Sequence, residues 1–167
     1  MASLQKDSVV ETWGHLIPKQ AGRSKDVYKM VREHIKSVIG KAGKGPWNSI
    51  EVKFKSVSGM GGLMGSLMSE KRDRLIVSWQ DYKIYVCSRP YGTDLDISWS
   101  MTFEPGFMKK VTGVDLASYN AFQVEDLRAF AALVHQAVTK AMDTVMQEAG
   151  LDPEKVNKTS KGFLGIS

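Results

Sequence analysis

The run from Leu95 to Phe103 constrains the fold more than any other part of the sequence. Large apolar residues occupy every second position, and aspartate, serine and threonine alternate with them. Side chains of a strand point alternately to the two faces of a sheet, so this run predicts a strand with one apolar and one polar face.

Three further strands are expected before it. Ser49–Val57 alternates in the same way, and Arg74–Trp79 and Tyr82–Ser88 are rich in β-branched and aromatic residues. Gln80-Asp81 and the Arg89–Asp94 segment, which contains Pro90 and Gly92, are turn signals. The sequence therefore predicts a four-stranded antiparallel meander over residues 49–104.

Helical periodicity appears on both sides of this meander. Ser8 and Glu11 have capping-box spacing before a short helix expected over Val9–Ile17, which Pro18 would end. Longer helices are expected from Lys25 to Ile39 and from about Phe122 to Ala149, with Ser24 and Asn120 as N-caps. The fold class is thus α+β, with the long C-terminal helix packed on one face of the sheet. Helix-grip and other sheet-plus-helix folds share this element order.

The length of 167 residues fits one domain with its own hydrophobic core. We expect an N-terminal helix and loop over 1–23, a core over 24–153 and a flexible tail over 154–167. Cys87 is the single cysteine, which excludes an intrachain disulfide and fits a reducing compartment. The start of the sequence lacks the layout of a signal peptide, and no apolar run is long enough to span a bilayer. These features predict a cytoplasmic protein, for which peripheral association with a membrane stays open.

The net charge of +5 is unevenly distributed. Residues 1–72 carry 13 Lys/Arg against 6 Asp/Glu, a net +7, and residues 73–167 carry 10 against 12, a net −2. A basic half is typical of proteins with anionic partners, although a solvated lysine-rich face gives the same composition. The candidate contacts with such a partner are Lys25, Lys29, Arg32, Lys36, Lys53, Lys55, Lys71 and Arg72.

Ser58–Ser69 combines glycines with large apolar side chains. Each glycine weakens a helix by about 1 kcal/mol relative to alanine, so a loop between two strands is expected. The loop either folds back on the core or forms a docking surface, because methionine adapts to varied apolar partners. The candidate docking residues are Met60, Leu63, Met64, Leu67 and Met68.

No motif commits the chain to a chemistry. The three histidines fall on three different expected helices, and Asp94 and Asp96 are too few to hold a metal. Gly40–Pro46 lacks the lysine and hydroxyl of a phosphate-binding loop. We therefore nominate no catalytic residue, metal or cofactor, and a non-catalytic role is favoured.

The segment from Arg89 to Trp99, RPYGTDLDISW, resembles a PYG-x-DL-x-ISW turn-and-strand pattern of uncharacterised bacterial domains. Some of these domains are attached to membrane-associated proteins. The resemblance implies a bacterial α+β domain and favours association with a membrane or a membrane-bound assembly, and it implies no site residues.

Three hypotheses about function follow. The favoured one is an interaction module that docks to a protein partner or an anionic membrane surface through the Gly/Met loop and its basic flank. The second is nucleic-acid binding by the basic half, which predicts strong salt dependence. The third is a small-ligand pocket or an enzyme site between sheet and helix.

Overall fold

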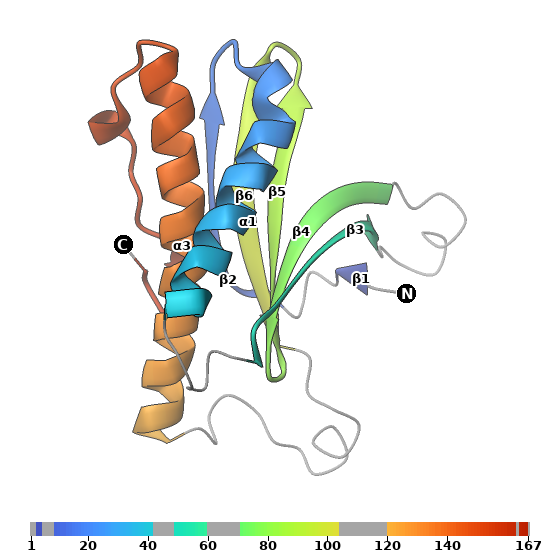
Figure 1. Cartoon of the computed structure of the whole chain (residues 1–167), viewed down its shortest axis with the longest axis vertical. Coiled ribbons are helices and arrows are strands. Elements are labelled where there is room, and N and C mark those ends of the chain that lie inside the picture. The colour runs from blue at the N-terminus through green and yellow to red at the C-terminus, as the bar shows by residue number, and fades with distance from the viewer. Residues whose placement is uncertain are drawn as a thin grey trace.

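The computed structural model describes residues 3–4, 9–41, 49–59, 71–103, 120–162 and 164–166. Its fold is α+β, with one mainly antiparallel sheet and a long C-terminal helix (Figure 1). In the described part of the chain, no helix has the length and apolar character needed to cross a membrane.

The expected meander is present as four consecutive antiparallel strands. These are β3 (Glu51–Gly59), β4 (Lys71–Trp79), β5 (Tyr82–Tyr91) and β6 (Asp94–Phe103). The alternation that predicted β6 matches its burial, because its apolar side chains are buried at every second position up to Met101. Periodicity therefore located these strands to within a few residues.

The sheet is larger than the four-stranded one predicted from sequence. Its order is β1-β3-β4-β5-β6-β2-β7, in which β1 (Ser3–Leu4) and β7 (Lys161–Gly162) are two-residue strands. The main addition is β2 (Val9–Ile17), which runs antiparallel to β6 from the Val9–Thr102 pair to the Ile17–Leu95 pair.

The predicted helix over Val9–Ile17 is thus wrong, since the segment is strand β2. Val9, Trp13 and Ile17 are four residues apart, a spacing that places them on one side of either a helix or a strand. The β-branched content favours the strand, Gly14 weakens a helix, and pairing with β6 provides the hydrogen bonds of the strand. His15 consequently lies on a strand and not on a helix.

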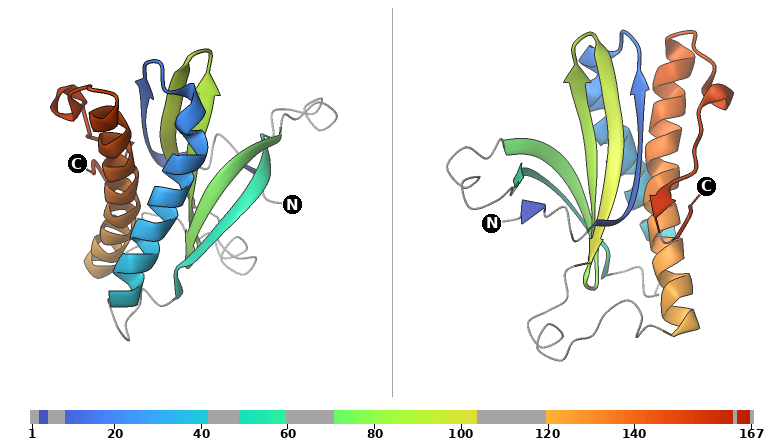
Figure 2. Two further views of the ribbon diagram at one scale, coloured as in Figure 1. Left: turned by 45° about the horizontal axis from the view of Figure 1, so that its top comes forward. Right: turned by 180° about the vertical axis from the view of Figure 1, so that it is seen from behind.

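Two long helices pack against one face of the sheet and against each other (Figures 1 and 2). Helix α1 (Ser24–Lys41) follows the short 3-10 helix η2 (Ala21–Arg23), and α3 (Ala121–Glu148) follows Asn120. Asn120 caps α3 as predicted, because its side chain accepts from the Gln123 amide and the Gln123 side chain accepts from the Asn120 amide, both at 3.0 Å.

The core joins the apolar faces of the sheet and both helices in one cluster. It contains a polar pair, because the Trp99 indole N–H donates to Nδ1 of His135 at 3.1 Å. Burial lowers the pKa of His135, although its hydrogen bond to the Lys158 backbone and the nearby Glu11 act in the opposite direction. A neutral imidazole, which can accept at Nδ1, fits this position.

The segment after α3 packs back onto the sheet, where a flexible tail was expected. It contains the 3-10 helix η5 (Pro153–Lys155) and β7, and Leu164 and Ile166 are buried. The buried carboxylate of Glu11 on β2 accepts hydrogen bonds from the Ser160 hydroxyl and from the Leu164 and Gly165 amides. Glu11 therefore anchors this segment and does not cap a helix.

Candidate functional site

The sheet divides between β4 and β5. The two strands pair only from Leu75–Val86 to Trp79–Tyr82, although β4 begins at Lys71 and β5 continues to Tyr91. Beyond this ladder, the β3–β4 hairpin curves away from β5 and from α1 (Figures 1 and 2).

Side chains of α1 occupy the point of division. The Tyr28 hydroxyl donates to the Asp73 carbonyl of β4 and accepts from the Ser88 amide of β5, each at 2.9 Å. Extending the register beyond Leu75–Val86 by two residues on each strand would pair Asp73 with Ser88 directly, so the hydroxyl stands in place of a ladder hydrogen bond. The Ser24 hydroxyl donates to the Ser88 carbonyl at 2.5 Å.

The sequence of β5 supports the same division. In an antiparallel ladder every second residue directs its backbone groups to a given neighbour, and from Ser88 the next such residue is Pro90, which has no N–H. Burial raises the pKa of Tyr28 above its usual value, so its hydroxyl keeps the proton that it donates. Tyr28 and Pro90 thus favour separation of β4 from β5 over a continuous sheet. We call this point of separation the fork.

Changing Tyr28 to phenylalanine is expected to lower the free energy of unfolding by about 1–3 kcal/mol, because the part-buried Ser88 amide loses its acceptor. Urea denaturation followed by circular dichroism measures this change. Tyr91→Phe is the matched control, since Tyr91 is 65% exposed and a change there is expected to stay within about 0.5 kcal/mol. Equal unfolding midpoints for the two variants would contradict the role given to Tyr28.

Two adjoining hollows of about 550 and 610 Å³ lie between α1 and the hairpin, and both are lined by Tyr28 and Phe54. We call them together the α1–hairpin groove. Among the residues that the structure describes, seven cations and two carboxylates line it, a formal charge of +5. The charged lining residues are Lys25, Lys29, Arg32, Glu33, Lys36, Arg72, Asp73, Arg74 and Arg89.

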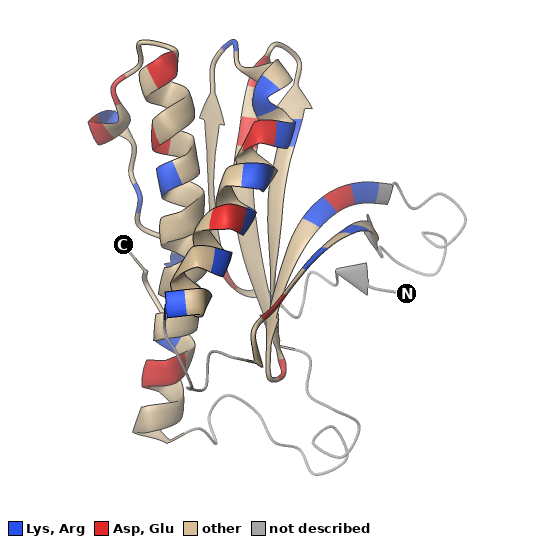
Figure 3. Ribbon diagram, viewed as in Figure 1, with Lys and Arg blue, Asp and Glu red and all other residues tan. Residues whose placement is uncertain are grey.

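The cations come from both walls of the groove. Figure 3 shows Lys and Arg along α1 and along the facing part of β4. Two of the arginines also make local contacts: Arg89 pairs with Asp96 at 2.9 Å, and Arg74 donates to the Asp73 carbonyl at 3.0 Å. Even with the Arg89 charge balanced in this way, the groove keeps a clear excess of positive charge.

An aromatic pair lies where the two hollows meet. The rings of Tyr28 and Phe54 are edge to face, with centroids 5.1 Å apart. Phe54 is 53% exposed although it is a large apolar side chain on a strand. The groove therefore combines positive charge with an accessible aromatic surface.

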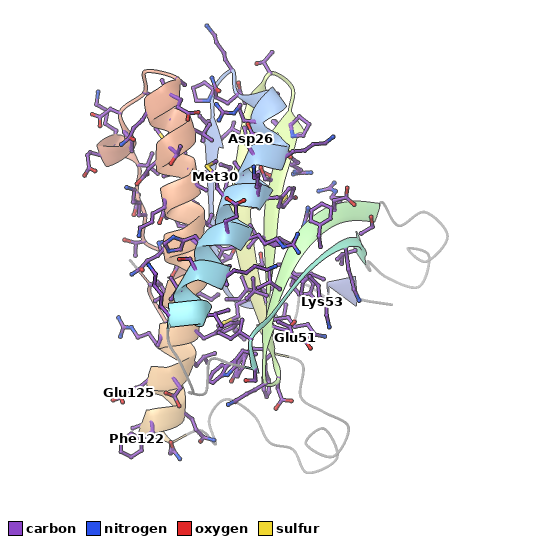
Figure 4. The ribbon with its side chains drawn as sticks, viewed as in Figure 1. Asp26, Met30, Glu51, Lys53, Phe122 and Glu125 are labelled. Atoms are coloured by element: carbon purple, nitrogen blue, oxygen red, sulfur yellow. The ribbon has the colours of Figure 1, made fainter. Side chains whose placement is uncertain are left out.

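The structure distributes the candidate contact residues over different surfaces. Lys25, Lys29, Arg32, Lys36 and Arg72 line the groove. Lys53 and Lys55 alternate with Phe54 along β3 and do not line it, and Lys53 pairs with Glu51 (Figure 4). The side chain of Lys71 and the whole of Met60, Leu63, Met64, Leu67 and Met68 lie outside the described residues.

Tyr28, Phe54 and Arg89 line the groove, although the sequence did not indicate them as candidate contacts. Tyr28 lay outside the apolar stripe of its helix, and Phe54 was assigned to the apolar side of β3. An aromatic residue among the basic positions of a helix is the one local signal that could have suggested Tyr28. Nothing local indicates that Phe54 is exposed, because its exposure depends on the divergence of the hairpin.

The other polar residues considered in the sequence make local contacts or are at least partly buried. Asp94 accepts from the Lys19 amide at 3.0 Å, and Asp96 pairs with Arg89. Cys87 is buried, and burial raises the pKa of its thiol. Burial lowers the pKa of His15 and, with help from nearby lysines, that of His34. Within the described ranges, no cluster of three or more His, Cys, Asp or Glu could hold a metal ion.

Comparison with known proteins gave no match: no family model, no curated protein and no solved structure is significantly similar to this chain.

Proposed function

We propose that the protein is a non-catalytic interaction module that binds an anionic partner in the α1–hairpin groove. The observation that carries this proposal is the gathering of seven cations and two carboxylates on the facing walls of one groove. The formal charge of this lining, +5, equals that of the whole 167-residue chain. The rest of the molecule is therefore close to neutral in sum.

Electrostatics favours a polyanion in such a place. Like charges held within about 8–10 Å of one another repel at physiological salt, and an anionic partner relieves that repulsion. A concave surface of one sign also concentrates the field and speeds encounter with oppositely charged partners. Both effects weaken as salt is raised, so the proposed binding should be strongly salt-dependent.

The groove offers charge and aromatic surface, which serve recognition. Its described lining contains no histidine or cysteine, and the Asp73 carboxylate accepts a hydrogen bond from Ser56. No nucleophile adjoining a general base stands among these residues, which supports a binding role over a catalytic one.

The Gly/Met segment remains part of the proposal. Residues 60–70 connect β3 to β4, the two strands of the hairpin that forms one wall of the groove. Met60, Leu63, Met64, Leu67 and Met68 therefore belong to a segment joined to this wall, and we propose that they add apolar contacts to the partner held in the groove.

Reversing two charges on α1 tests the groove. Lys29→Glu combined with Arg32→Glu is expected to weaken binding of a fluorescent heparin fragment at least tenfold at low salt, because two attractive charges become repulsive. Fluorescence anisotropy measured between about 50 and 200 mM salt gives the affinity and its salt dependence.

The control carries the same change in net charge at a distance from the groove. Lys155→Glu combined with Lys161→Glu alters exposed lysines on η5 and β7, and neither lines the groove. It is expected to keep most of the heparin affinity. If both double variants lose affinity equally, binding depends on overall charge and the groove is not the site. If the unmodified protein does not bind heparin, the proposal is wrong.

A further inference from the structure

We propose that the partner held in the α1–hairpin groove is a single-stranded nucleic acid, with phosphates on the α1 wall and a base stacked on Phe54. This inference rests on the proposed function and deepens it by naming the chemistry of the partner. Three features of the groove carry it: the spacing of the lysines and arginine on α1, the arginines of the opposite wall, and the exposed aromatic ring between them.

Four of the cations on α1 form a single line. Lys25, Lys29, Arg32 and Lys36 follow the spacing i, i+4, i+7 and i+11, which at 100° per residue keeps them within an arc of about 60°. With a rise of 1.5 Å per residue, the intervals along the helix axis are about 6, 4.5 and 6 Å. This regular spacing suits the repeated charges of an extended sugar–phosphate backbone, whereas a compact anion would meet only one or two of the four.

The opposite wall supplies arginines. Arg72 and Arg74 of β4 line the groove on the side of the hairpin, and Arg89 of β5 lines it where β5 separates from β4. The planar guanidinium group matches a phosphate with two parallel hydrogen bonds and also stacks on aromatic bases, which an ammonium group does not do. Cations on both sides of the groove can contact the phosphates of a nucleic-acid strand that lies within it.

Phe54 distinguishes a nucleic acid from other polyanions. Its ring is half exposed between the two hollows, and the edge-to-face contact with Tyr28 supports it from one side. A charged groove with an aromatic platform is the usual arrangement for binding single strands without sequence preference. An acidic peptide has no base to stack there, and the bases of a duplex are already stacked on one another.

The test compares how tightly the full chain binds four probes, which are labelled molecules or vesicles. These are an oligothymidine or oligouridine strand about 15 nucleotides long, a duplex of that length, a polyglutamate peptide and phosphatidylserine-containing vesicles. We expect the single strand to bind at least tenfold more tightly than the duplex or the peptide at the same salt. Binding of either the deoxyribose or the ribose strand supports the inference.

Phe54→Ala separates stacking from charge. It is expected to weaken single-strand binding about 5- to 100-fold, the range for loss of one stacked base, without changing the slope of log K against log salt. Lys29→Glu with Arg32→Glu is expected to reduce the magnitude of that slope by about 1 or more. Phe54→Trp, which keeps an aromatic face, is expected to retain the affinity.

Phe122→Ala is the matched control. Phe122 is 77% exposed at the start of α3 and does not line the groove (Figure 4), so its removal should leave single-strand binding unchanged. Thermal denaturation of each variant establishes that it is folded.

The outcomes distinguish this inference from the proposed function. If polyglutamate or the vesicles bind as tightly as the single strand, and Phe54→Ala has no more effect than Phe122→Ala, the nucleic-acid inference is overturned while the anion-binding groove stands. Equal binding of duplex and single strand also overturns it. If none of the four probes binds, the nucleic-acid inference fails, and if heparin does not bind either, the proposed function fails with it.

Discussion

Replacing Glu11 with alanine is expected to lower the free energy of unfolding by about 3–5 kcal/mol, because hydrogen bonds to a charged acceptor contribute roughly 1.5–3 kcal/mol each. The Glu11 carboxylate is 1% exposed. It accepts from the Ser160 hydroxyl, from the Leu164 amide at 2.8 Å and from the Gly165 amide at 3.2 Å. Alanine removes this shared acceptor and leaves two buried or part-buried amides unpaired.

The groups around Glu11 cannot readily replace the hydrogen bonds that its carboxylate accepts. The Ser160 hydroxyl also accepts from the Ile166 amide at 2.7 Å, and the Ser160 amide donates to the Ile166 carbonyl at 2.7 Å. Gly162 lies against Glu11 with φ +148°, and a Cβ there would come within 2.5 Å of the carboxylate. The segment closes on itself around Glu11, so its loss should release residues 160–166 from the sheet.

Urea denaturation measures the global effect of Glu11→Ala, and limited proteolysis of the native protein measures release of the C-terminal segment. Glu154→Ala is the control, because Glu154 is an exposed carboxylate on η5 and its removal should cost no more than about 0.5 kcal/mol. Similar midpoints and cleavage patterns for the two variants would show that the Glu11 hydrogen bonds do not hold this segment.

Trp99→Ala is expected to lower the free energy of unfolding by about 3–5 kcal/mol, the usual cost of deleting a large buried aromatic side chain. Trp99 is 0% exposed on β6, and it pairs across the sheet with Trp13 on β2 and Val86 on β5. Its indole also donates to His135 on α3. The side chain therefore joins three strands to the long helix.

Trp99→Phe separates the contribution of side-chain volume to stability from that of the hydrogen bond to His135. Phenylalanine keeps an aromatic ring in the core but leaves Nδ1 of the buried His135 without its donor, at an expected cost of about 1–3 kcal/mol. Chemical denaturation should therefore rank the two variants, with alanine the more damaging. A cost below about 1 kcal/mol for Trp99→Ala would mean that the core around His135 is not packed as described.

The elements themselves could largely be predicted from sequence. Strands β3 to β6 and helices α1 and α3 follow from periodicities of two and of three to four residues, which local sequence displays directly. The spacing of Lys25, Lys29, Arg32 and Lys36 places them on one face of a helix, and these four residues line the groove. Local pattern was sufficient because each of these features depends on neighbours only a few positions away.

The local sequence pattern led to a wrong prediction where a helix and a strand fit it equally well. The apolar positions of Val9–Ile17 suit a helix or a strand, and the capping-box spacing of Ser8 and Glu11 favoured the wrong one. The decision was made by pairing with β6, whose residues lie 78 to 93 positions away from their partners in the sequence. Glu11 then became an acceptor for a segment about 150 positions away, and not part of a helix cap.

The charge, strands β3 to β6, helices α1 and α3 and the basic line on α1 were thus determined by the sequence alone. The fork and the groove were decided only by the tertiary structure, because Tyr28 meets Asp73 and Ser88 across separations of 45 and 60 residues. Hydrogen bonds between such distant groups leave no period in the sequence. Only the packing of the elements decides which group forms a hydrogen bond with a backbone amide or carbonyl at the end of a strand.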